Sequence, residues 1–466
     1  MTSQIVPRSA FLTEFRQSKS GIVGLIILLS LIIISLYAIL AIPLESFRQW
    51  NNPNYWINYP KAAAPQWTNT GIFGPKVFEH LIMNLDDASI TKTVIADNIQ
   101  TEIHSYTIDF SYDSYPSDFM IPYSVQYGEI PPLLQVDIIR PDGEEFKIYY
   151  SSLPSSLLNS NKNQFSSRIF STDPIIGEYL RQIADSFRYP QDISKPQVMI
   201  FSDVEENKVL KGKYIIKETF YLFNDSDTVQ ESGLILGGRV YGLMGTDELR
   251  RDLAIGILWG TPVALFIGLS VSIGSVVIGL IYGVMAGYKG NRTDEGLMRI
   301  NDIFYTLPAL PLLIIMSITI GRSIFLITGF LVIFGWAGTA KVTRSLAMQI
   351  KNLQYVEAAK LMGQSDIKII FKHIIPQLLP LTFASIAISV PGAILGEAGL
   401  SFLGLGDPSI PTWGQILHEA NSAGAASRGL WWWIMPPGFM IALTGLSFVL
   451  IGNTLDSILN PKARKF

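Results

Sequence analysis

Six long stretches of the chain contain no charged residue and are rich in apolar side chains, and polar segments separate them. The first stretch, Gly21–Ile42, has 22 residues, and the second, Leu253–Tyr288, has 36. An α-helix rises about 1.5 Å per residue, so about 20 apolar residues cross the roughly 30 Å hydrocarbon core of a bilayer. The pattern predicts six transmembrane helices. The remaining four stretches are Ile303–Gly321, Ser323–Ala340, Ile374–Gly396 and Leu430–Leu455.

The first stretch has two possible interpretations, a cleaved signal peptide or an uncleaved span. It is longer than the apolar region of roughly 7–15 residues found in signal peptides, and only Ala41-Ile42-Pro43 follows where a small-residue cleavage site would stand. We therefore interpret residues 21–42 as transmembrane helix 1, preceded by a polar segment, residues 1–20.

Residues 43–250 form a polar insert of about 200 residues, which is enough for one folded domain. The sequence Arg140-Pro-Asp-Gly143 is a turn signal between two strand-like runs. We expect a β-rich (α+β) domain, and no catalytic motif is apparent in it. The predicted strands are Leu133–Ile139, Glu145–Ser151, Val198–Phe201 and Tyr214–Phe223, and the predicted helix is Ile175–Phe187.

Aromatic residues gather soon after the first span. They could form a ligand-stacking surface, but packing at the base of the insert or a place at the membrane interface is favoured. The residues are Trp50, Tyr55, Trp56, Tyr59 and Trp67.

Charge is distributed unevenly between the insert and the remainder of the chain. Residues 43–250 carry 27 acidic and 17 basic residues, whereas the rest carries 11 acidic and 18 basic. Positive charge gathers on cytoplasmic loops of membrane proteins. This rule predicts that both termini are cytoplasmic and that the insert is extracytoplasmic. The predicted cytoplasmic segments are 1–20, 289–299, 341–373 and 456–466; Lys462, Arg464 and Lys465 lie in the last.

The composition excludes several kinds of chemistry. The chain has no cysteine, so it has no disulfide and no thiol nucleophile, and its four histidines are far apart in sequence. No basic domain indicates nucleic-acid binding. A phosphate-binding loop is also missing, because Gly212-Lys213 is followed by Tyr and lacks the leading glycine. We expect no enzymatic activity and no cofactor in this chain.

The polar stretch Tyr355–Pro376 lies between two apolar runs and predicts a short helix, a turn and a second helix. Glu357-Ala358-Ala359 favours helix, and Gly363 is a typical left-handed helix terminator. A helix of small residues projecting from a bilayer suits docking into a groove of another protein, although an ordinary amphipathic loop helix has the same spacing.

The spacing is also that of a known family. Glu-Ala-Ala, three residues, Gly363, nine residues and the tetrad His373-Ile374-Ile375-Pro376 together resemble the EAA loop (about 344–376) of ABC-importer permeases, in the peptide branch. The amino-acid sequences of residues 5–42 and of the C-terminus resemble those of C-type subunits of that branch. Further similar stretches are Leu243–Asp252, Ala286–Pro308, Thr339–Ser345, and Glu397–Gly406 with Pro411–Gly414.

One of these stretches departs from the family pattern. LMGTDELRRD, residues 243–252, resembles LGTDxxGRD, but Arg250 stands where glycine is expected. Thr246 or Asp247 also suits the N-cap of the helix that follows.

The resemblance implies an all-α polytopic membrane protein of the type I ABC-importer permease type, with five spans in a core of residues 251–466. It implies half of a translocation path for peptides or similar solutes, a second permease as heterodimer partner, two ATPase subunits that bind ATP and Mg, and an extracytoplasmic solute-binding protein. The protein would lie in the cell membrane. The ATPase-docking helix would use Tyr355, Val356, Glu357, Ala358, Ala359, Gly363 and Pro376.

Two carboxylates are further candidates. Asp302 lies three residues after Arg299, which predicts a surface ion pair or, less simply, a conformational contact. Glu397 ends an uncharged run, so it is either a functional charge near hydrocarbon or an ordinary helix end.

An alternative function is a membrane-anchored ligand sensor or channel whose external insert is the binding domain. It would explain the insert and the spans but not the EAA spacing. Relatives of the peptide branch handle peptides, nickel complexes or oligosaccharides, so the resemblance leaves the substrate open.

Overall fold

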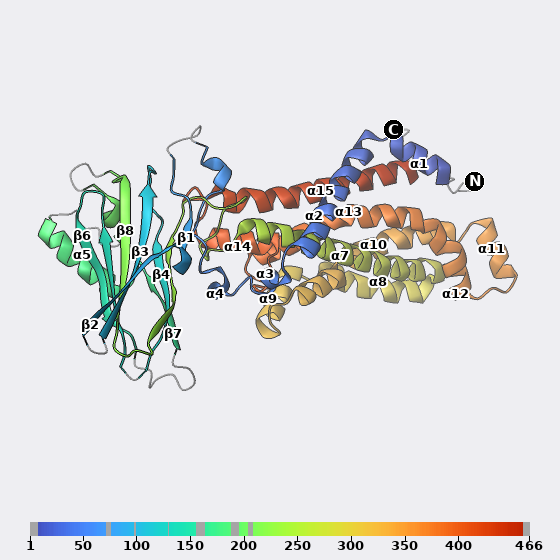
Figure 1. The fold of residues 1–466 in the computed structure, drawn as a ribbon. Helices are drawn as coiled ribbons and strands as arrows, with labels where there is room; N and C mark the ends of the chain where they lie inside the picture. The colour runs from blue at the N-terminus through green and yellow to red at the C-terminus, as the bar shows by residue number, and fades with distance from the viewer. Residues whose placement is uncertain are drawn as a thin grey trace. The chain divides into compact units, whose positions relative to one another are not determined.

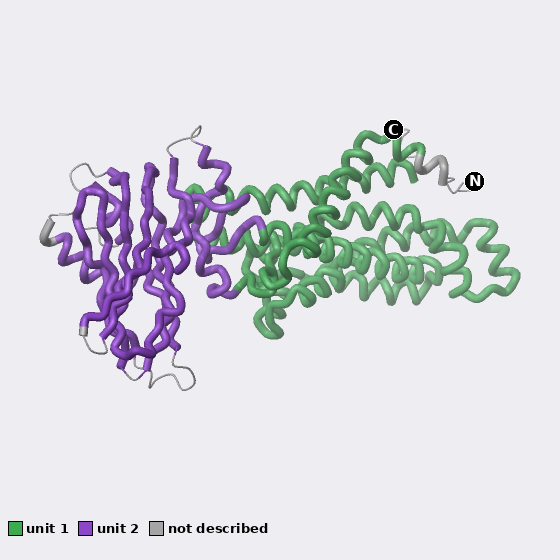
Figure 2. Tube along the Cα trace, viewed as in Figure 1, with its two compact units in different colours: residues 1–51, 255–466 green, residues 52–254 purple. Residues whose placement is uncertain are grey.

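The computed structural model describes residues 8–70, 76–96, 99–128, 130–154, 164–187, 195–203 and 208–459. These form two compact units (Figure 2). The helical unit comprises Met1–Asn51 and Ile255–Phe466, and the β unit comprises Asn52–Ala254. The prediction began the insert at residue 43, whereas the β unit begins at Asn52. The predicted basic residues Lys462, Arg464 and Lys465 lie outside the described residues.

The helical unit is built from long helices joined by shorter ones (Figure 1). Its helices are α1 (Arg8–Gln17), α2 (Lys19–Ala41), α3 (Leu44–Arg48), α7 (Leu253–Lys289), α8 (Asn291–Thr306), α9 (Ala309–Thr319), α10 (Ile324–Ile350), α11 (Gln354–Leu361), α12 (Asp366–Ile369), a π-helical turn (Ile370–Ile374), α13 (Ile375–Phe402), α14 (Trp413–Ser422) and α15 (Trp431–Leu459).

Five described helical segments are long and apolar enough to cross a membrane, namely α2, α7, α10, α12–α13 together and α15. The sequence predicts one continuous run over Ile303–Gly321, but the structure breaks it into α8 and α9, which are bent by 75°. The reason is Pro308, because a proline disfavours helical geometry in the residue before it, and Leu307 is extended (φ −62°, ψ 133°).

Small residues let the long helices approach closely. A Cβ on Gly279, Gly283 or Gly287 of α7 would lie 2.7, 2.1 or 2.5 Å from atoms of α10. These glycines are four residues apart, so they share one face of α7. Thr343 of α10 donates a hydrogen bond to the Gly279 carbonyl (2.9 Å) across the contact. Such small-residue contacts are typical of helices packed within lipid.

The N-terminal span α2 is held to α15 in the same way. A Cβ on Gly24 would lie 2.9 Å from the Ser447 carbonyl oxygen, and the Ser447 hydroxyl donates to the Gly24 carbonyl (2.8 Å). Residues at opposite ends of the sequence therefore form one helix pair of the bundle.

The β unit contains two five-stranded antiparallel sheets (Figure 1). One has the order β1-β10-β4-β7 with β9 also paired to β4, and the other has the order β2-β3-β8-β5-β6. The strands are β1 (Leu81–Met83), β2 (Ser89–Ala96), β3 (Ile99–Phe110), β4 (Phe119–Gln126), β5 (Leu133–Ile139), β6 (Glu145–Ser152), β7 (Gln164–Phe170), β8 (Gly212–Leu222), β9 (Thr228–Ser232) and β10 (Leu234–Leu236); the helices are α4 (Pro53–Trp56), α5 (Pro174–Phe187) and α6 (Pro196–Phe201).

One hydrophobic core takes side chains from both sheets. On β3, alternate residues Tyr106, Ile108 and Phe110 are buried, which is the period expected of a strand with one face inward. Ile121 and Tyr123 contribute from the other sheet. The arrangement is a two-sheet packing in which the inner faces meet.

Most of the predicted elements of the insert are confirmed. The turn after Arg140 joins β5 to β6, with Gly143 in the left-handed region (φ +90°), and the predicted helix is α5. The prediction of a strand at Val198–Phe201 is wrong, because these residues belong to α6. Pro196 at the first helical position favours that start, and a short apolar run alone cannot distinguish a buried strand from a buried helix.

The aromatic residues after the first span separate into buried and exposed ones. Trp50 is fully buried in the helical unit, where its ring fills the space beside Gly256 of α7, and Trp56 is fully buried in the β unit. Packing within the insert is therefore confirmed for Trp56, whereas Trp50 packs in the helical unit instead. Trp67, by contrast, is 52% exposed.

The stretch before α7 is stabilised by buried polar contacts. The Asp247 carboxylate accepts from the backbone N–H groups of Leu249 (2.8 Å) and Arg251 (2.9 Å) and pairs with the Arg251 guanidinium (2.6 Å). The expected N-cap at Thr246 or Asp247 is wrong: α7 begins at Leu253, and Asp252 accepts from the Ala254 N–H (2.8 Å).

Arg250 adopts a backbone conformation that favours glycine, with φ +66°. This is the position where the family pattern has glycine. Its guanidinium donates to the Tyr59 carbonyl (2.8 Å) and pairs with Asp118 of the strand β4 region. The side chain thus links three segments of the β unit and offsets the backbone strain.

Candidate functional site

Helix α11 and the turn after it have the predicted helix–turn–helix form. Gly363 lies in the left-handed region (φ +78°), its N–H donates to the Lys360 carbonyl (3.0 Å), and the Gln364 N–H donates to the Ala359 carbonyl (3.2 Å). This pair of bonds is the Schellman helix terminator, which requires glycine or an equivalent at that position. The chain then turns into α12 at Asp366.

One face of α11 is fixed to the helical unit. Val356 and Ala359, three residues apart, are buried, whereas Glu357 and Ala358 between them are exposed. The buried pair belongs to a hydrophobic cluster that combines α7, α10, the π-helical turn and α13. Its other members are Leu280, Val284, Ala347, Ile369, Ile370, Ile374 and Leu378.

The opposite surface of the loop exposes large apolar side chains. Leu361, Met362 and Ile367 are 85%, 73% and 71% exposed. Large exposed apolar side chains on a short loop otherwise rich in lysine are typical of an interaction surface. Tyr355 is partly exposed and lies beside the His373 ring, with ring centroids 6.3 Å apart.

Polar contacts attach the loop to the neighbouring helices. The Tyr288 hydroxyl at the end of α7 donates to the Asp366 carboxylate (3.1 Å), and the Lys351 ammonium donates to the Gly287 carbonyl (3.1 Å). His373 and Gln364 are hydrogen bonded (2.9 Å). These contacts join the segments on either side of α11 to the ends of α7 and α10.

The loop joins span α13 through a π-helical turn. Residues Ile370–Ile374 have this wider geometry, and Pro376 follows in the first turn of α13. π-Helical turns in helices occur frequently at functional sites. The predicted residue Pro376 thus lies in the first turn of α13 and within the apolar segment Asp366–Phe402, which begins earlier than the sequence indicated.

Ion pairs join α8 to α10 near the same loop. Arg344 makes a bidentate pair with Asp294 (2.5 and 2.6 Å), and the buried Asn301 donates to the Ala337 carbonyl (3.0 Å). The predicted Asp302–Arg299 pair is wrong: Asp302 pairs with Lys341 of α10 (2.9 Å), while Arg299 lies 3.8 Å from Glu295.

Sequence reasoning missed the Asp294–Arg344 pair. Its signal was present, because Asp294 lies in the family-like stretch Ala286–Pro308 and Arg344 in Thr339–Ser345. The sequence did not indicate that α8 packs against α10.

Glu397 lies inside α13 rather than at its end. It is buried, and its carboxylate accepts a hydrogen bond from the Ser401 hydroxyl (2.6 Å) one helical turn later. Thr412 then caps α14 by accepting from the Gln415 N–H (3.1 Å). The contacts described for Glu397 and Asp302 are therefore made with residues outside α11.

A cavity of about 270 Å³ opens between α7, α10 and α13. Its walls combine apolar side chains with hydroxyl groups, which suits a solute that is only partly polar. The hydroxyl residues that line it are Thr339, Thr343, Thr382, Ser385 and Ser389. Within the part of the chain that the structure describes, no group of three or more His, Cys, Asp or Glu is placed to hold a metal ion.

These features define a multi-pass helical membrane protein that carries a folded β unit and presents a short helix between two spanning helices. Comparison with known proteins specifies the class further. Residues 279–465 match the family described as "Binding-protein-dependent transport system inner membrane component".

Curated relatives extend the match. The dipeptide transport system permease protein DppC of Bacillus subtilis (strain 168) is 36% identical over 222 residues, covering 47% of this chain and 69% of the relative. The oligopeptide transport system permease protein OppC of Haemophilus influenzae is 38% identical over 225 residues, covering 48% and 71%. The chain therefore belongs to this family, and it is a permease subunit of an ABC importer.

A solved structure of the MetNI methionine ABC transporter also aligns, with a TM-score of 0.35 and 18% identity, over 43% of this chain and 96% of that one. A similarity of this size does not inform the site.

Proposed function

We propose that this chain encloses half of the translocation path for peptides or similar small solutes and receives the work of ATP hydrolysis through α11. Its partners would be a second permease subunit, two cytoplasmic ATPase subunits that bind ATP and Mg, and an extracytoplasmic solute-binding protein. The observation that carries the proposal is the two-sided character of α11: Val356 and Ala359 are buried, and the other face is open.

The open face suits a protein groove. Ala358 is small, so a partner can approach the helix closely there, and Leu361 and Met362 offer apolar area at its end. Glu357 and Lys360 provide opposite charges on the same short helix. Tyr355 and Gly363 complete the docking element, the first by its exposed ring and the second by the turn that it permits.

Movement would pass from α11 into the bundle through the contacts already described. The α7–α10 glycine contact is tight, and α8 is bound to α10 by the Asp294–Arg344 and Asp302–Lys341 pairs. These three helices would therefore move together, and the π-helical turn before α13 supplies the joint. In this scheme Asp302 is a conformational residue that holds α8 to α10.

The path itself would run past α7, α10 and α13, where the hydroxyl-lined cavity lies. Peptides fit this surface because they combine apolar side chains with hydrogen-bonding backbone groups, and the relatives named above transport dipeptides and oligopeptides. Glu397, buried in α13, is a candidate pathway residue.

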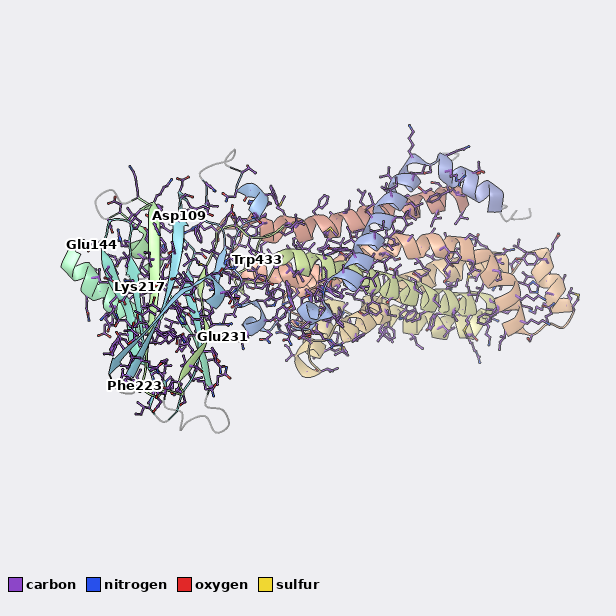
Figure 3. The ribbon with its side chains drawn as sticks, viewed as in Figure 1. Asp109, Glu144, Lys217, Phe223, Glu231 and Trp433 are labelled. Atoms are coloured by element: carbon purple, nitrogen blue, oxygen red, sulfur yellow. The ribbon has the colours of Figure 1, made fainter. Side chains whose placement is uncertain are left out.

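The proposed topology counts α8 and α9 together as one span, which gives six. Both termini and α11 would face the cytoplasm, and the β unit would be extracytoplasmic, in agreement with the positive charges on the α11 loop. Because the chain has no cysteine, single-cysteine variants test this cleanly. Lys360→Cys and Glu144→Cys, the latter in the β5–β6 turn (Figure 3), should react with impermeant reagents from opposite sides.

Ala358→Trp tests docking. The side chain is exposed, so the substitution should leave the chain's own fold intact while blocking close approach of a partner. In the reconstituted complex we expect solute uptake to fall by at least about tenfold, which corresponds to about 1.4 kcal/mol, with the melting temperature of the complex unchanged.

Two further variants make that result specific. Ala426→Trp, at an exposed alanine between α14 and α15, is the matched control and should transport normally. Gly363→Val should lose coupling between hydrolysis and uptake, because a left-handed residue costs about 1–2 kcal/mol without glycine, although nothing lies within 4 Å of a Cβ there. Normal uptake by both Ala358→Trp and Gly363→Val would contradict the proposal.

A further inference from the structure

Three hydroxyl groups of α13 make no hydrogen bond to another helix among the residues that the structure describes. Thr382 (2.8 Å) and Ser389 (2.7 Å) each donate to the carbonyl four residues earlier on α13, and the hydroxyl of Ser385 has no hydrogen-bond partner there. Thr343 of α10 differs, because it donates across the helix contact to the Gly279 carbonyl (2.9 Å). Packing between helices therefore accounts for the Thr343 hydroxyl but not for those of α13.

The three hydroxyls share one face of α13, which we call the α13 hydroxyl face, and this face lines the cavity of about 270 Å³. Residues 382, 385 and 389 lie on the same side of a helix because they are three and four positions apart. At 1.5 Å per residue they extend over about 10 Å, the length of about three residues of an extended chain. None of the described residues that line the cavity carries a charge.

The hydrogen bonds within α13 determine what each hydroxyl can offer a solute. A hydroxyl has one proton to donate and two lone pairs that accept. The protons of Thr382 and Ser389 are donated to the backbone, as is common in helices, so their oxygens remain as acceptors. Ser385, which lies between them, keeps its proton available. The face thus presents an acceptor, a donor and an acceptor in succession.

A peptide backbone has the complementary groups, because each of its units carries one N–H donor and one C=O acceptor. We propose that the α13 hydroxyl face binds the backbone of the transported solute: Thr382 and Ser389 accept from its N–H groups, and Ser385 donates to a carbonyl. The inference rests on the proposed function, in which the path runs past α13. It makes these residues determinants of specificity for the peptide backbone, so that peptides with different side chains share one path.

Protection of an introduced thiol tests this binding without the solute-binding protein. Val342→Cys places the thiol on α10 in the wall of the cavity, where Val342 is 55% exposed. The reconstituted complex of permeases and ATPases is treated with a small thiosulfonate reagent. Tripeptides of mixed sequence are added, or the same mixture with both amides replaced by esters, which keep each carbonyl and lack each N–H. The measured quantity is the solute concentration that halves the rate of labelling of this chain.

The parent complex and two variants should respond differently. We expect the parent to require a severalfold higher concentration of the esters than of the peptides. Ser389→Ala should raise the peptide concentration about three- to tenfold, the change expected from one hydrogen bond, and leave the ester concentration unchanged. Ser385→Ala should raise both concentrations, because both solutes keep their carbonyls. Ser30→Ala is the matched control, since its exposed hydroxyl donates to the backbone of α2 (2.7 Å), and it should change neither.

The comparison of peptides with esters uses the parent complex, so it does not depend on the folding of the alanine variants. Equal protection by the two mixtures would overturn the proposal, because the N–H groups would then not be recognised. A thiol that is labelled at the same rate with and without solute would also overturn it. So would a thiol that never reacts, since the second permease or lipid would then fill the cavity.

Uptake of the peptide mixture by the wild-type complex with its solute-binding protein separates this inference from the proposed function. Uptake without protection of the thiol would overturn the α13 hydroxyl face alone and leave peptide transport in place. If the mixture is neither taken up nor protective, the proposed transport of peptides is contradicted together with the inference.

Discussion

The two units place the same kinds of side chain in opposite ways. In the helical unit, large residues such as Ile318 and Phe325 are exposed, while glycines form the contacts between helices. In the β unit, Tyr106, Phe110 and Phe146 fill the core. The difference follows from the surroundings, because burial of apolar area drives folding in water but gains little within lipid, where close packing takes its place.

It follows that different kinds of substitution should destabilise the two units. The helical unit should be most sensitive to added volume at a helix contact, because the helices there have no space to move apart. The β unit should be most sensitive to charge in its core, because water cannot reach it. Substitutions that add volume at a helix contact, or that change an ionisable group in the β core, therefore test the comparison.

Gly283→Leu should have the largest effect. A Cβ at this position would lie 2.1 Å from the Thr343 hydroxyl and 2.2 Å from the Ala340 carbonyl, so α7 and α10 would have to separate. We expect a loss of about 3 kcal/mol or more in stability, measured by thermal unfolding of the purified chain in detergent. Gly392→Leu is the control, since nothing lies within 4 Å of a Cβ there. Equal losses in both variants would show that helix contacts are not the sensitive feature.

The corresponding weakness of the β unit is a buried carboxyl group. Glu218 of β8 is fully buried, and it accepts from the Ser232 hydroxyl (2.6 Å), which also contacts the Tyr106 hydroxyl (2.7 Å). In the sheet register it lies opposite His104 of β3, which is bound to Glu102 (3.0 Å). Burial raises the pKa of Glu218 to about 8, from 4.5.

The sign of the pH dependence follows directly. Between pH 4.5 and about 8 the folded state keeps a proton on Glu218 that the unfolded state releases, so stability falls as pH rises through this window. Glu218→Gln removes this dependence. At pH 7 the gap of about 2.5 pH units corresponds to a stabilisation of up to about 3 kcal/mol.

Hydrogen exchange of the β3 and β8 amides measures this gain. The advantage of Glu218→Gln should shrink toward pH 4.5. Glu231→Gln is the matched control, because Glu231 is exposed on β9 next to Ser232 (Figure 3). If the wild type and Glu218→Gln show the same protection at pH 5 and pH 8, the carboxyl group does not carry its proton in the folded state.

Arg250 allows a smaller, two-way test within the β unit. Arg250→Ala loses the contacts to Asp118 and Tyr59 and keeps the left-handed backbone, whereas Arg250→Gly loses the same contacts but relieves the backbone. We expect the glycine variant to be more stable than the alanine variant by about 1 kcal/mol. Thermal melting checks the order, and equal stabilities would mean that the backbone at residue 250 is not strained.

Much of the fold was predictable because its determinants are local. The apolar length of α2 and α7, the turn signal before Gly143 and the glycine at residue 363 each act within a few residues. The helix–turn–helix of the candidate docking element was therefore predicted with its buried and exposed residues unassigned. The side of α11 that is buried depends on Leu280 and Ala347, which are distant in sequence.

The predictions that were wrong or missing also depend on residues that are distant in sequence. Asp302 was assigned to Arg299 by local spacing, but Lys341 of another helix is its partner. Nothing in the sequence indicated that Glu218 is buried, because its surroundings depend on the register of β3 with β8. The run at Val198–Phe201 was too short for periodicity to separate helix from strand, and only its neighbours in the core decide it.

The smallest predicted effect concerns charge in the helical unit. Asp302 and Lys341 are both about half exposed, so water screens their pair, and Asp302→Asn should cost only about 0.5 kcal/mol or less. Asp294 is mostly buried and holds Arg344 through two hydrogen bonds, so Asp294→Asn should cost more, about 1–3 kcal/mol.

Transport separates the two roles of Asp302. If the Asp302–Lys341 pair is a surface ion pair with no role in transport, uptake by Asp302→Asn equals that of the wild type at every salt concentration. If it holds α8 to α10 while α11 moves, uptake falls although the melting temperature hardly changes, and high salt reduces wild-type uptake toward the level of the variant because ions screen the pair. Wild-type uptake by Asp302→Asn at low salt would remove Asp302 from the proposed mechanism and leave Asp294 as the contact that joins these helices.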